Sequence, residues 1–160
     1  MNQIVKNRFR IALAVLILSQ GQAIAQEALS IDTDSNTYVR TADGPFDDIA
    51  FAVEQAIINE GLVIDLTSHV GDMLARTKED VSGTKDLFTH ARIFSFCSAA
   101  VSREVMESDP SNIQHCPYTI FVYETVENPN EILVGHRNYP GETMTPVNKM
   151  LSRIVDFGVE

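Results

Sequence analysis

Two apolar runs, ARIFSFC (Ala91–Cys97) and YTIFVY (Tyr118–Tyr123), decide how this chain folds. Apolar residues rich in aromatic and β-branched types predict strands over Leu87–Phe96 and Tyr118–Thr125. The segment between them, Ala99–Glu107, predicts a helix that Ser98 caps. The chain's only two cysteines stand at the edges of these runs, so any chemistry is expected here.

Toward the N-terminus, the clearest signal is an amphipathic helix over Phe46–Glu60. Apolar residues recur there at three- and four-residue spacing, and Gly61 supplies the expected stop. A strand is predicted on either side of this helix, over Asn36–Ala42 and Leu62–Leu66. A short second helix is predicted over Val70–Lys78, with Val70, Met73 and Leu74 on its apolar side.

Toward the C-terminus, the strand that begins at Tyr118 is followed by a second strand over Glu131–Asn138. Glu127-Asn128-Pro129-Asn130 lies between them and has the composition of a turn, so the pair predicts an antiparallel hairpin. A final helix begins near Thr145 and Pro146. The residues of its predicted apolar stripe are Val147, Met150, Leu151, Ile154 and Phe157.

The predicted order is β-α-β-α-β-α-β-β-α. Each helix carries a single apolar stripe, which suits helices that cover one face of a sheet. We therefore expect an α+β two-layer sandwich with one mostly antiparallel sheet and helices packed on one face.

The first 25 residues have the pattern of a cleaved signal peptide. Lys6, Arg8 and Arg10 precede the eight apolar residues Ile11–Leu18, and Ala23-Ile24-Ala25 forms a small-x-small cleavage site. Eight apolar residues are too few to span a bilayer, which needs about 20. We expect cleavage after Ala25, a flexible lead-in over residues 26–36, a single domain over residues 37–160, and a periplasmic or secreted location.

The charge of the chain limits its partners. The sequence has 12 basic and 22 acidic residues; removing the three basic residues of the signal peptide leaves 9 against 22, a net charge of −13. Such a negative field repels phosphate backbones and anionic lipids. We therefore expect no nucleic-acid partner and no membrane partner after signal cleavage.

Two cysteines in an exported protein raise the question of a disulfide. If the two central strands are parallel, Cys97 and Cys116 lie roughly 20 Å apart at 3.3 Å per residue. If the strands are antiparallel, both cysteines fall at one end of the sheet, and a bridge is feasible. Two free thiols and a reactive Cys97, activated at the N-terminus of the following helix, stay open as alternatives.

The other polar residues near the cysteines complete a candidate binding set: Cys97, Ser98, His115, Cys116 and Pro117. His115 with the two cysteines could form a Cys₂His set for copper or zinc, although hydrogen-bonded or surface histidines are the simpler interpretation. The sequence contains no G-x-S-x-G, no P-loop, no G-x-G-x-x-G and no heme-attachment motif. It identifies no cofactor and no catalytic residue beyond the weak candidate Cys97.

Several of these segments resemble the family known as domain of unknown function 302. The matching pieces are Gly44-Pro45-Phe46-Asp47-Asp48, Glu60–Asp65, Ile93–Cys97 and Pro117–Glu124, in that order. The resemblance covers about Tyr38 to Phe157 and implies a compact α/β sandwich without an established activity. Many members of the family place a cysteine directly after the proline of the last piece. Here that position is Tyr118, and Cys116 precedes the proline instead.

Three hypotheses about function follow. The first is a periplasmic accessory module that binds a small ligand or a metal near the cysteines. The second is a thiol-dependent enzyme with Cys97 as nucleophile. The third is a structural or dimerising protein, so an unidentified small ligand, a protein or a second copy of the chain are the candidate partners.

Overall fold

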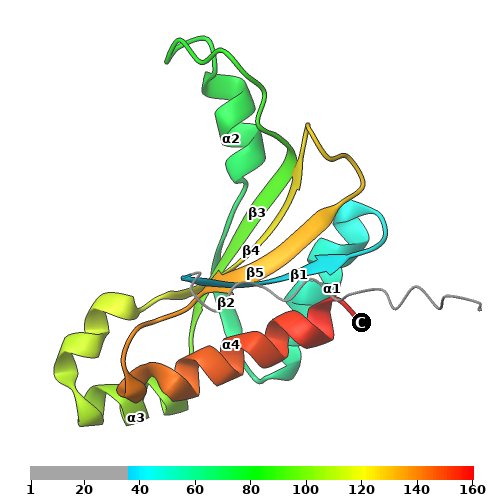
Figure 1. Cartoon of the computed structure of the whole chain (residues 1–160). Helices are drawn as coiled ribbons and strands as arrows, with labels where there is room; N and C mark the ends of the chain where they lie inside the picture. The colour runs from blue at the N-terminus through cyan, green and yellow to red at the C-terminus, as the bar shows by residue number, and fades with distance from the viewer. Residues whose placement is uncertain (1–35) are drawn as a thin grey trace, which may run out of the picture. The chain divides into compact units, whose positions relative to one another are not determined.

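The computed structural model describes residues 36–160 (Figure 1). The expected signal peptide and nearly all of the expected lead-in lie outside the described residues. The elements, in chain order, are β1 (Thr37–Ala42), α1 (Phe46–Asn59), β2 (Val63–Ser68), α2 (Val70–Thr77), β3 (Phe88–Cys97), α3 (Ala99–Ser108), the 3₁₀ helix η1 (Pro110–His115), β4 (Tyr118–Thr125), β5 (Ile132–Arg137), the 3₁₀ turn η2 (Glu142–Met144) and α4 (Thr145–Gly158).

The five strands form one open sheet in the order β1-β5-β4-β3-β2, and every neighbouring pair is antiparallel. The expected α+β fold with an antiparallel sheet and the expected hairpin of β4 and β5 are confirmed. Alternate side chains of β4 are buried, beginning with Tyr118. One face of the sheet therefore faces a core and the other does not.

α1 forms where its apolar spacing predicts it. The carbonyl of Pro45 accepts hydrogen bonds from the amides of Asp48 and Ile49 and so begins the helix. Gly61 ends it in the left-handed conformation, at φ +77°, which glycine adopts without steric cost.

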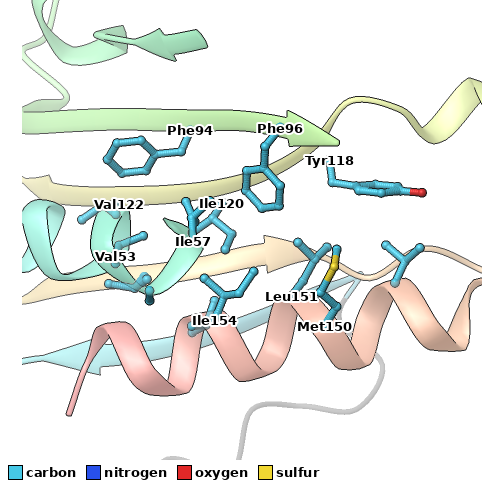
Figure 2. Close-up of a cluster of buried hydrophobic side chains, with 14 of the residues drawn as sticks. Val53, Ile57, Phe94, Phe96, Tyr118, Ile120, Val122, Met150, Leu151 and Ile154 are labelled. Atoms are coloured by element: carbon cyan, nitrogen blue, oxygen red, sulfur yellow. The ribbon is translucent and has the colours of Figure 1, made fainter. Parts of the chain in front are cut away.

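The core lies between the sheet and two long helices. α1 packs against α4, and both contact the sheet. In Figure 2, Val53 and Ile57 of α1 and Leu151 and Ile154 of α4 approach the side chains that β3 and β4 direct inward. Ser98 caps α3 as expected, because its Oγ accepts a hydrogen bond from the amide of Val101 at 3.3 Å. α3 adds Val105 to the same core.

α2 is placed apart from the other helices. Figure 1 shows it at the top, whereas α3 and α4 lie at the bottom and α1 lies at the right. It contacts β3, and a Cβ on Gly71 would lie 2.8 Å from the backbone nitrogen of Ala91. The missing side chain of Gly71 therefore allows the helix to approach the strand closely.

Two details of the expected apolar stripes are wrong. Met73 of α2 is 42% exposed and Phe157 of α4 is 61% exposed. In α4 the buried positions near the helix end are Val155 and Gly158 instead. Gly158 lies against Val53 of α1, where a Cβ would come within 2.7 Å of a methyl group, so helix packing selects the position without a side chain.

None of the helices formed by residues 36–160 combines the length and the apolar content that a membrane-spanning helix requires.

Candidate functional site

The antiparallel pairing of β3 and β4 brings the two cysteines together. Phe96 pairs with Tyr118, so Cys97 at the end of β3 lies beside Cys116, which precedes β4. Their Cα atoms are 6.5 Å apart, within the range that a disulfide requires. The structure therefore contains a pair at disulfide distance, which the sequence could only offer as one alternative.

The other residues of the predicted binding set lie at the same end of the sheet and have structural contacts. Ser98 is buried and serves as the cap of α3. The ring of His115 lies 5.1 Å from the ring of Tyr139, and Pro117 is exposed after a cis peptide bond. Within residues 36–160, no three His, Cys, Asp or Glu side chains gather as they would around a metal ion.

A groove lies elsewhere, on the face of the sheet that α1, α3 and α4 leave open. Its volume is about 490 Å³, which is within the usual range for small-molecule sites. It extends over β3 and β4 to the start of α2. The lining residues are Val70, Phe88, Ala91, Arg92, Ile93, Phe121, Val122, Tyr123 and Thr125.

Aromatic rings form much of this groove. The ring of Tyr123 lies 5.6 Å from that of Phe88 and 5.8 Å from that of Phe121, in edge and tilted arrangements. Arg92 does not bring a free charge to the groove, because its guanidinium forms an ion pair with Asp47 at 2.6 Å and lies over the ring of Phe46. The groove is therefore suited to an apolar or aromatic molecule.

A second polar centre surrounds His136, a residue that no sequence motif indicated. His136 is fully buried; its Nδ1 lies 2.9 Å from the carbonyl oxygen of Arg137, and its Nε2 lies 3.0 Å from Oγ of Ser152. Burial lowers its pKa below the ordinary value of 6.5, against smaller opposing effects from the Arg137 carbonyl and Asp156. The sequence did hold a signal: His136 follows Ile132 and Val134 at two-residue spacing, on the buried face of β5.

Three further side chains, those of Tyr38, Arg40 and Asp156, lie at the edge of this centre. The ring of Tyr38 stacks on His136 at 5.4 Å, and the Tyr38 hydroxyl donates a hydrogen bond to Asp156 at 2.7 Å. Arg40 forms an ion pair with the same carboxylate at 3.3 Å. Burial and the bond to Asp156 raise the pKa of Tyr38 above 10.0, so its hydroxyl stays protonated and donates at neutral pH.

Comparison with known proteins identifies a family and a similar fold. The family model described as "Domain of unknown function DUF302" matches residues 38–155. The crystal structure of an uncharacterized conserved DUF302 protein from Bacillus stearothermophilus is similar, with a TM-score of 0.61 and 14% sequence identity. The match covers 76% of this chain and 97% of that one. The search of curated proteins finds no match.

Proposed function

The chain belongs to the DUF302 family, and on this premise we propose that it is an exported accessory module that binds a small, largely apolar molecule. The site is the groove on the open face of the sheet, at Ile93, Phe121 and Tyr123. The observation that carries the proposal is the groove itself, whose lining is mostly apolar and aromatic.

Two independent features of the chain support export. The basic, apolar and small-residue segments of the first 25 residues have the order of a signal peptide. Cys97 and Cys116 stand at disulfide distance, and disulfides form in oxidising compartments such as the bacterial periplasm. A periplasmic or secreted location accounts for both.

The class of ligand follows from the groove. Phe88, Phe121 and Tyr123 offer ring faces and edges. A charged group would lose hydration there without a free partner, because Arg92 is held by Asp47. The ligand is therefore a neutral molecule with an apolar or aromatic body.

The predicted binding set around the cysteines is less well supported as a ligand site. In the structure Ser98 caps a helix and His115 packs on Tyr139. A thiol-dependent enzyme is also less well supported, because a Cys97 bonded to Cys116 has no thiolate to act as a nucleophile.

The test uses the protein purified after export and the uncharged, apolar fluorescent dye Nile red. Phe121→Ala removes a groove ring, and Phe157→Ala removes an exposed ring of α4 as the matched control. We expect Phe121→Ala to weaken Nile red binding about tenfold or more, since a buried aromatic ring contributes roughly 1.5–3 kcal/mol. Equal affinity of the wild type and both variants would contradict the proposed site.

A further inference from the structure

One side of α4 carries a shallow depression of about 450 Å³ that shares no lining residue with the groove. Its lining residues are Thr145, Asn148, Lys149, Ser152, Arg153 and Asp156. We propose that Ser152 is a nucleophile, that His136 is its general base, and that the depression takes small carboxylic esters, which the pair hydrolyses.

The hydrogen bonds assign the proton positions. The carbonyl oxygen of Arg137 can only accept, so Nδ1 of His136 carries the hydrogen that bridges their 2.9 Å separation. In the neutral ring Nε2 is then the acceptor, and the hydroxyl of Ser152 donates to it across 3.0 Å. This is the arrangement that activates a serine: a base within hydrogen-bond reach, and a third group that holds the base in the right tautomer.

Ser152 lies at the border between the buried core and the depression. A serine inside a helix often returns its hydroxyl to the carbonyl four residues earlier, but here the hydroxyl bonds to the histidine of β5. The side chain is half-buried and lines the depression. The base is fully buried beneath it, so the imidazole reaches the depression only at Oγ of Ser152, where Nε2 meets the reactants.

Two of the charged side chains around the pair already have partners. The Asp156 carboxylate binds Tyr38 and Arg40. The Arg153 guanidinium forms an ion pair with Glu60 at 3.2 Å. Lys149 precedes Ser152 by three residues and lines the same depression, since residues at this spacing share a helix face. Its ammonium supplies positive charge beside the ester carbonyl, where the oxyanion develops.

The reaction balances with water as the second reactant. Oγ of Ser152 forms a bond to the ester carbonyl carbon, and its proton passes to Nε2 of His136. The bond from that carbon to the alcohol oxygen breaks, and the alcohol leaves with the proton from Nε2. Water then attacks the acyl-serine: its oxygen bonds to the carbon, its proton passes through Nε2 to Oγ, and the carboxylic acid is released.

Burial of His136 lowers its pKa, which keeps the ring neutral and able to accept a proton at neutral pH. The groups that face it are the Tyr38 ring, the Arg137 carbonyl and, farther away, the Asp156 carboxylate paired with Arg40. None of these groups is the partner of Nε2, so its lone pair accepts the Ser152 proton.

The test is covalent labelling of the exported protein with a fluorophosphonate probe, followed by peptide mass mapping. We expect the adduct on Ser152 in the wild type and hydrolysis of p-nitrophenyl acetate by the same protein. Ser152→Ala should abolish both, whereas Ser102→Ala, which loses a hydroxyl bonded to Tyr118, should retain both. His136→Gln should slow labelling by roughly 100-fold or more, the usual contribution of a general base.

Mapping the adduct in the wild-type protein keeps the test independent of whether the variants fold, which circular dichroism checks separately. A wild type that stays unlabelled under the conditions that label a serine hydrolase would overturn the proposal. An adduct confined to other residues, or ester hydrolysis unchanged in a folded Ser152→Ala protein, would also overturn it.

Discussion

The ring of Phe121 on β4 lies directly over Gly135 on β5. The two residues are partners in the antiparallel register, and a Cβ at position 135 would come within 2.7 Å of the ring. The glycine thus makes room for the aromatic side chain to lie across the open face of the sheet, where it contributes to the groove.

Gly135→Ala should therefore destabilise the protein. The added methyl group would meet the Phe121 ring and also the backbone carbonyl of Tyr38, and overpacking of this kind costs about 1–3 kcal/mol. Urea denaturation followed by circular dichroism measures the free energy of unfolding.

Gly61→Ala is the control for this prediction, because its φ is +77° but no atom lies within 4 Å of the added methyl group. It should cost only about 1 kcal/mol, the price of a left-handed alanine. In the double variant Gly135→Ala/Phe121→Ala, the loss in free energy of unfolding should differ from the sum of the two single losses, since the two residues are in contact. Additive losses would contradict the contact.

Cys97 and Cys116 should be disulfide-bonded in the exported protein. Intact mass without reductant should be two hydrogen masses below that of the reduced protein, and alkylation should modify neither cysteine. Reduction should lower the free energy of unfolding by about 3 kcal/mol, because the bond closes a loop with a sequence separation of 19. The double variant Cys97→Ala/Cys116→Ala is the control, and its stability should not respond to reductant. Two freely alkylated thiols would refute the bond.

The stability of the fold should decrease at mildly acidic pH because of His136. Burial lowers the pKa of His136 in the folded protein below 6.5, so the unfolded chain binds a proton more readily. The contribution of the neutral histidine is fully present above pH 6.5 and is lost as the pH falls through the folded-state pKa. Urea unfolding between pH 8 and pH 5 measures the slope of the free energy of unfolding against pH.

His136→Gln should reduce this slope, whereas His69→Gln, at the exposed start of α2, should leave it unchanged. An equal slope in the His136 variant would exclude this residue as the cause.

The signal peptide should be removed after Ala25. The exported protein should begin at Gln26, which N-terminal sequencing or intact mass determines. Ala25→Pro should block processing and leave the longer chain, whereas Gln26→Ser should be processed normally. A wild-type exported protein that still begins at Met1 would contradict cleavage.

Local sequence patterns were sufficient for the α-helices and strands of the fold, although not for the two 3₁₀ elements η1 and η2. The apolar spacing of α1, the glycine that ends it and the serine that caps α3 depend on neighbours within a few residues. The hairpin of β4 and β5 could be predicted for the same reason. The helix stripes were less accurate at Met73 and Phe157, because burial near a helix end depends on the element packed against it, as the contact of Gly158 with Val53 illustrates.

The tertiary structure alone decided which distant residues meet. The antiparallel order of β3 and β4 chose between cysteines at opposite ends of the sheet and cysteines at disulfide distance. The placement of the helices left one sheet face open, where Phe121 lies across Gly135. The packing of α4 on β5 brought Ser152 to His136, sixteen residues away in the chain. Strand order and helix placement arise from burial of the whole core, a long-range sum of contacts that no local spacing encodes. By itself, the sequence determined the helices and strands; how these elements pack determined the candidate sites.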